Sequence, residues 1–183
     1  MFSRRIMENV AALAAVPLFA PLERIGHRRK AGMFAASSVS DADYTFACTA
    51  ARSGLSEVAL GRLAGRRALD EEVRSYGDHM VREHSPVNTR LMGLGLAKRM
   101  VLPVRPDDEQ DAFRRRLDAL EGAEFDRLYV ARMVSDHEAA VEHFRHQRDH
   151  GEDRDLAAFA ERNLPMLERH LDMARALAQR LGE

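Results

Sequence analysis

The stretch AEFDRLYVARMVSDHEAAVEHFRHQRDH, residues 123–150, decides the class of fold. It contains no proline or glycine, and large apolar residues such as Phe125, Val134 and Phe144 recur at helical spacing along it. This spacing gathers them on one face of an α-helix, and Gly151 directly after it is a natural stop. The stretch therefore predicts a long amphipathic helix.

The same period extends in both directions along the chain. It predicts further long helices over residues 41–66, 70–98 and 153–181, and a short one over residues 107–120. We expect kinks at Pro86 and Pro165, because a proline inside a helix lacks the N–H that the helix needs. No segment alternates apolar and polar residues as a strand would. The sequence predicts an all-α, up-and-down four-helix bundle with the short helix in the crossover between its second and third long helices.

Composition excludes several classes of protein. The 183 residues suit one domain, and 45% hydrophobic with 31% charged residues is typical of a globular chain. A net charge of -1 provides no field that would recruit nucleic acid, so we expect no nucleic-acid partner. The single cysteine, Cys48, excludes an internal disulfide and a cysteine-rich metal cage. Homo-oligomer formation remains open.

The N-terminal residues resemble an export signal. Arg4 and Arg5 precede the apolar run VAALAAVPLFAPL, residues 10–22, which is short for a membrane span but typical of a signal-peptide core. We expect residues 1–36 to be an export signal of the twin-arginine or Sec type with a linker. Residues 37–183 would then be a periplasmic helical domain with no membrane span of its own. An uncleaved N-terminal anchor is the alternative.

Each predicted long helix carries one polar, metal-competent residue on or beside its apolar face. These residues are Glu57, His84, His137 and His170. His84, for example, lies one turn from both Met80 and Val87. Glu83 and Asp136, each next to one of the histidines, are candidate outer partners or alternative ligands.

Two interpretations of these residues remain open. The first is a hydrogen-bonded polar layer that fixes the register of the helices. The second is a mononuclear site for a divalent Zn, Cu or Fe ion, since imidazole and carboxylate ligands suit these metals. We expect His143, His146 and His150 to lie instead on a solvated face at a helix end. Asp126 and Tyr129, one turn apart, are expected to share a structural hydrogen bond.

Two segments, MVREH at residues 80–84 and MVSDH at residues 133–137, repeat a methionine, a valine, an acid and a histidine. Together with their flanking stretches, over about residues 41–180, they resemble the bacterial domain-of-unknown-function family 4142. The resemblance implies an exported, ferritin-like helical bundle in which Glu57, His84, His137 and His170 occupy motif positions. It implies no substrate or reaction.

The resulting hypothesis is an exported bundle that binds a metal ion, in metal handling or envelope stress. A metal-dependent or redox enzyme is one alternative, and it would need an open coordination position and a reachable pocket. A structural or interaction module whose polar layer binds nothing is another.

Overall fold

The computed structural model describes residues 39–182, and all regular structure within this range is helical. The helices are α2 (Asp41–Arg67), α3 (Glu71–Ala97), α4 (Asp108–Asp118), α5 (Gly122–His150) and α6 (Arg154–Gly182). They confirm the predicted all-α fold, with bounds close to those expected from the periodicity. The predicted export signal lies outside the described residues.

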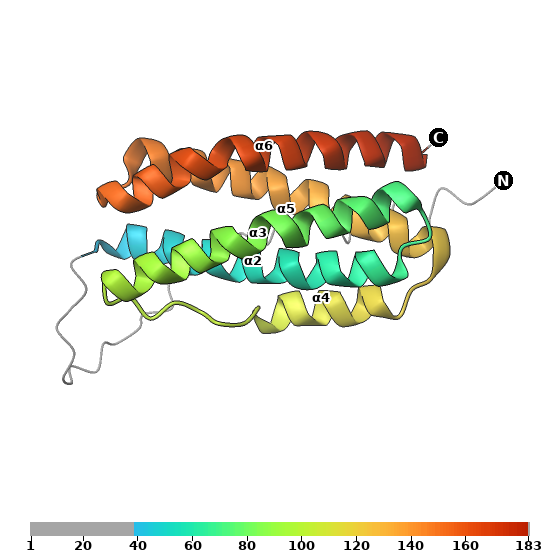
Figure 1. Ribbon diagram of the computed structural model, residues 1–183, viewed down its shortest axis with the longest axis horizontal. Helices are drawn as coiled ribbons and strands as arrows, with labels where there is room; N and C mark the ends of the chain where they lie inside the picture. Colours follow the sequence, from blue (N-terminus) through green and yellow to red (C-terminus); the bar gives the residue numbers. More distant parts are fainter. Residues whose placement is uncertain (1–38, 183) are drawn as a thin grey trace.

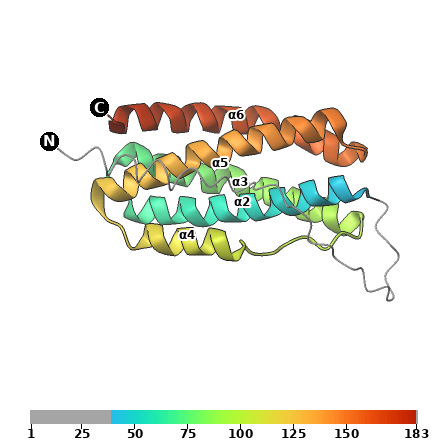
Figure 2. The ribbon, with the colours of Figure 1, turned by 180° about the vertical axis from the view of Figure 1, so that it is seen from behind.

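Two antiparallel hairpins make up the bundle. α2 pairs with α3 and α5 pairs with α6, and the two hairpins lie against each other (Figures 1 and 2). Between them the chain crosses the length of the molecule through α4, which runs along the outside of α2. α3 and α5 consequently run in the same direction, as in ferritin-like bundles with one long crossover. None of the helices described is both long and apolar enough to cross a membrane.

Side-chain caps fix where the helices begin. The Ser40 hydroxyl accepts from the Asp43 amide at the start of α2, and the Asp70 carboxylate accepts from two amides at the start of α3. Asp107 and Gln110 form a reciprocal capping box at the start of α4. Gly122, with a φ of 58°, makes the sharp turn into α5 that a side chain would disfavour. Caps of this kind satisfy amides that have no partner within the helix.

Asp126 differs from its predicted role. Its carboxylate accepts from the amides of Leu69 and Asp70 at 3.0 and 2.8 Å, in the turn between α2 and α3. The Tyr129 hydroxyl is buried without a hydrogen-bond partner, so the expected Asp126–Tyr129 bond is wrong. Two unpaired amides in a turn hold the carboxylate more strongly than one hydroxyl would.

Close contact between α2 and α3 depends on glycine. A Cβ atom added at Gly61 would lie 2.6 Å from the carbonyl oxygen of Gly77, and one added at Gly77 would lie 2.8 Å from the carbonyl oxygen of Gly61. The backbones therefore approach too closely for any side chain at this crossing.

Pro86 and Pro165 both lie inside helices that continue without interruption.

The core consists of two apolar clusters. The first includes Phe46, Leu91, Phe144 and Leu167, and the second includes Leu63, Met80, Tyr129 and Leu177. On each long helix, one of the predicted polar residues lies near the boundary between the part that contributes to the first cluster and the part that contributes to the second. These residues are Glu57, His84, His137 and His170. The predicted polar positions therefore form a layer across the middle of the bundle.

Candidate metal centre

Three buried histidines meet in this layer. His84 on α3, His137 on α5 and His170 on α6 are exposed by 2%, 0% and 0%. Their ring centroids lie 5.1 to 5.7 Å apart. One nitrogen from each ring can be chosen so that the three atoms lie within 4.8 Å of one another. Helices far apart in the sequence thus bring three imidazoles to one point.

Each of these rings uses one nitrogen to contact an oxygen. Nδ1 of His84 lies 2.7 Å from Oε2 of Glu57, and Nε2 of His170 lies 3.1 Å from Oε2 of Glu83. Nδ1 of His137 lies 2.9 Å from the carbonyl oxygen of Met133. A carbonyl or carboxylate oxygen accepts, so each of these nitrogens carries the hydrogen. The tautomer of every ring is therefore set by its outer partner.

The other three nitrogens point inward with their lone pairs. Nε2 of His84 and Nδ1 of His170 lie 3.1 Å apart, and Nε2 of His137 is buried with no hydrogen-bond partner. A neutral ring that donates outward has no hydrogen left for the space between the rings. A single cation at that point would satisfy the inward lone pairs together.

Burial keeps two of the rings neutral. It lowers the pKa of His137, against the attraction of Glu57, and it lowers the pKa of His170 to about 2, with the nearby His84 adding to the effect. For Glu57, burial favours the neutral acid, but the adjacent His84 and the hydrogen bond that it donates outweigh burial, so the pKa of the carboxyl is lowered. The centre thus pairs one buried carboxylate with two imidazoles that burial keeps in the neutral form, which is the form that binds metals.

Comparison with known proteins places the chain in a family. A family model described as "Domain of unknown function (DUF4142)" matches residues 29–177. The chain belongs to this family. The predicted resemblance is therefore confirmed.

Among solved structures, the chain is similar to a crystal structure of a DUF305 fragment from Deinococcus radiodurans. The TM-score is 0.68 at 12% identity, over 78% of this chain and 98% of that one. A likeness at this identity shows the helical fold alone. None of the curated proteins matches the chain.

The residues predicted for the metal site of this DUF4142 domain do not all face its centre. His84, His137 and His170 converge, whereas Glu57 lies behind His84, with its other oxygen 4.0 Å from Nε2 of His137. Glu83 holds the outer nitrogen of His170. Asp136 binds Nε of Arg132 through both oxygens at 2.8 Å, and Arg132 covers the ring of Phe113 on α4. Asp136 thus serves the contact with α4.

Two residues that the sequence analysis did not assign to the site contact it. Nε2 of His79 lies 3.1 Å from Oε1 of Glu83, and its ring centroid lies 5.2 Å from that of His170. The Tyr76 hydroxyl donates to the carbonyl oxygen of His170 at 3.1 Å and so fixes α6 against α3. His79 and Glu83 are one turn apart in the sequence, a spacing that signals contact on a helix surface.

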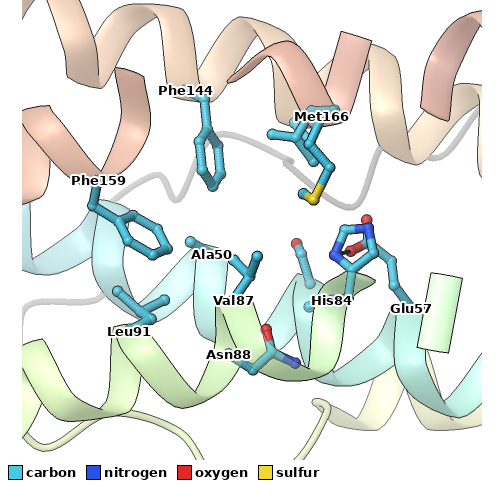
Figure 3. Close-up of a pocket in the computed structure, with 13 residues that line it drawn as sticks. Ala50, Glu57, His84, Val87, Asn88, Leu91, Phe144, Phe159 and Met166 are labelled. Carbon is cyan, nitrogen blue, oxygen red and sulfur yellow. Dashed lines mark ion pairs between the residues drawn. The ribbon is translucent and has the colours of Figure 1, made fainter. Parts of the chain in front are cut away.

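Beside His84 lies a cavity of about 20 Å³. Figure 3 shows Glu57 and His84 together at one end of it, with Met166 from α6 and Phe144 from α5 on the opposite side. The buried hydroxyl of Ser53, which has no hydrogen-bond partner, also lines it. A cavity of this size holds about one water molecule.

The histidines near the end of α5 differ from one another. His146 and His150 are exposed and pack ring against ring at 4.9 Å, as expected for a solvated face. His143 lies against Phe46 at 5.0 Å, and burial lowers its pKa to about 4. It is half-buried, so the predicted solvated face is shorter than expected.

Proposed function

We propose that this protein binds one divalent Zn, Cu or Fe ion in the middle of its bundle and acts in metal handling. The ligands are Nε2 of His84, Nε2 of His137 and Nδ1 of His170. The observation that carries the proposal is the convergence of three buried nitrogens whose rings all donate outward. Imidazole ligands suit all three of these metals. Which of them is bound therefore depends on metal supply and on the geometry of the site.

The outer partners support this assignment. Histidine ligands of protein metal sites almost always donate their second N–H to a carboxylate, a backbone carbonyl or water, which orients the ring and raises its basicity. Here Glu57 and Glu83 are the carboxylates and Met133 provides the carbonyl. Glu57 adds a buried negative charge that compensates part of the charge of the ion.

A polar layer without a ligand is the main alternative. In that case the contact of 3.1 Å between His84 and His170 would require one of the two rings to turn an N–H inward, either as a second hydrogen or by giving up its hydrogen bond to Glu57 or Glu83. Nε2 of His137 would still be buried without a partner, which costs free energy. The metal satisfies all three nitrogens at once and is therefore the better account.

An enzymatic role has less support. The cavity beside Glu57 and His84 has the volume of about one water molecule, which leaves no room for an organic substrate. We therefore propose binding or storage of the ion as the role, with metal-dependent or redox catalysis as the alternative.

Export to the periplasm remains part of the proposal. It rests on the arginine pair and the apolar run at residues 10–22. A periplasmic location agrees with a role in metal handling or envelope stress.

Substitutions of single histidines by alanine test the proposal. The full chain, purified without a histidine tag, should contain metal, and His84→Ala and His137→Ala should each lower the metal content measured by mass spectrometry. His146→Ala should leave it unchanged, because His146 lies on the exposed surface of α5. Equal losses from all three substitutions would mean adventitious surface binding and would contradict the proposal.

A further inference from the structure

We propose that His79, Glu83 and His170 form a second, outer metal site at which the ion docks before it reaches the buried centre. The inference rests on the proposed function and adds the route by which the ion enters. It starts from a second group of ligand-competent side chains, again within 4.8 Å, which shares His170 with the first group.

The outer group connects the surface with the core. The side chains of His79 and Glu83 are exposed by 21% and 28%, whereas that of His170 is fully buried. Glu83 lies between the two histidines, with one oxygen 3.1 Å from Nε2 of His79 and the other 3.1 Å from Nε2 of His170. Two imidazoles and a carboxylate are a ligand set for the same metals as the buried centre.

His170 contributes opposite nitrogens to the two sites. Its Nδ1 points to His84 and the buried centre, and its Nε2 points to Glu83 and the outer group. An ion at the outer site binds Nε2, so the hydrogen of the ring moves to Nδ1 and donates to Nε2 of His84. When the ion binds Nδ1 inside, the hydrogen on Nδ1 is given up to solvent water as a proton, and Nε2 takes up a proton from water beside the partly exposed Glu83. The ring carries one hydrogen in both states, and the two sites exclude each other at neutral His170.

Two arginines oppose an ion at the outer site. Nη2 of Arg169 lies 3.4 Å from Oε2 of Glu83, and Arg82 donates to Nδ1 of His79. Arg169 is 61% exposed, and its long contact with Glu83 is weak, so an arriving cation can displace it. Occupation of the outer site also requires Arg82 to release His79. The arginines therefore set a barrier to entry, and removing one of them should speed entry.

Rates of metal uptake test the route. The full chain, freed of metal by chelation, is mixed with Co²⁺, and its absorption is followed by stopped flow. We expect His79→Gln to slow uptake by about tenfold or more, because one of the three ligands of the outer site is lost. Arg169→Gln should accelerate it. Final occupancy of one ion per chain should be the same in both variants, and His146→Gln should match the wild type.

The opposite signs separate this route from general destabilisation, which would change both variants in the same direction. Uptake at the wild-type rate in His79→Gln would overturn the route while leaving the buried site intact. A lower final occupancy in His79→Gln would also overturn the route, because His79 would then contribute to the buried site itself. A wild-type chain that takes up no Co²⁺ would overturn the buried site and the route together.

Discussion

At the scale of single residues, the hydrogen carried by each histidine determines what the centre can bind. Glu57, Glu83 and the Met133 carbonyl each take one N–H, and this turns the remaining nitrogens toward one another. The three histidines would form an ordinary polar layer if any of their rings pointed its N–H inward. The chemistry therefore depends on the outer partners as much as on the histidines.

Glu57→Gln tests this dependence. The amide still offers an oxygen to His84 but no negative charge, so we expect the metal dissociation constant to rise by roughly 10- to 100-fold. Competition with a chelator of known affinity measures it. The control is Glu138→Gln, at a carboxylate that pairs with Arg175 on the exposed surface. An unchanged dissociation constant in Glu57→Gln would show that the charge of Glu57 has no part in binding.

At the scale of helices, the periodicity predicted most of the fold because it is a local property. The apolar spacing that predicted residues 123–150 corresponds to a helix over Gly122–His150, and the predicted short helix over residues 107–120 corresponds to α4, which Asp107 caps. The turn partner of Asp126 could not be predicted, because the two amides it binds lie more than fifty positions earlier in the chain.

The candidate site was only partly predictable for the same reason. Helical period places His84 and His137 on apolar faces, but it does not say which neighbouring acid reaches them. Consecutive residues on a helix point about 100° apart. Glu83 therefore turns toward α6 and meets His170, whereas Asp136 turns toward α4 and meets Arg132. His79 enters the site only because α6 brings His170 beside it.

The close crossing of α2 and α3 leads to a prediction about the stability of glycine variants. Gly61→Ala should destabilise the protein by about 1–3 kcal/mol, because the added methyl group would press on the backbone of Gly77 and force the helices apart. Gly93→Ala, at an exposed helical position with open space around it, should instead stabilise by about 0.5–1 kcal/mol through helix propensity. Urea unfolding measures the change in stability of both variants. Changes of the same sign in Gly61→Ala and Gly93→Ala would contradict the close approach of α2 and α3.

At the scale of the whole molecule, charged contacts tie the two hairpins together at their ends. Lys98 after α3 binds Asp153 and Asp155 before and within α6, both at 2.7 Å. At the other end Arg180 binds Asp70 at 2.7 Å. These contacts fix the hairpins at both ends, while the polar layer holds them in the middle.

Asp70 predicts how stability varies with pH. The hydrogen bond from Arg180, opposed by burial and aided by the amides of Val73 and Glu72, lowers the pKa of Asp70 from 3.8 to about 2. Because the folded value is the lower one, the contribution of Asp70 is complete above pH 3.8 and is lost as pH falls toward 2. Asp70→Asn, which keeps an N-cap oxygen, should cost up to about 1 kcal/mol at pH 7.

Below pH 2 the wild type and Asp70→Asn should be equally stable, as measured by urea unfolding over a pH series. A difference that stays constant from pH 7 to pH 2 would assign the effect to the cap alone. Arg180→Gln provides the matched variant, since it removes the same ion pair from the other side.

The central claim is that the middle of the bundle holds one metal ion. The most direct measurement is the metal content of the untagged full chain, by mass spectrometry, together with its melting temperature before and after chelation. The account predicts about one ion per chain, and a melting temperature that falls on chelation and returns on reloading, because an ion bound only to the folded state stabilises it. A metal-free chain whose melting temperature responds to neither chelator nor metal would contradict the account.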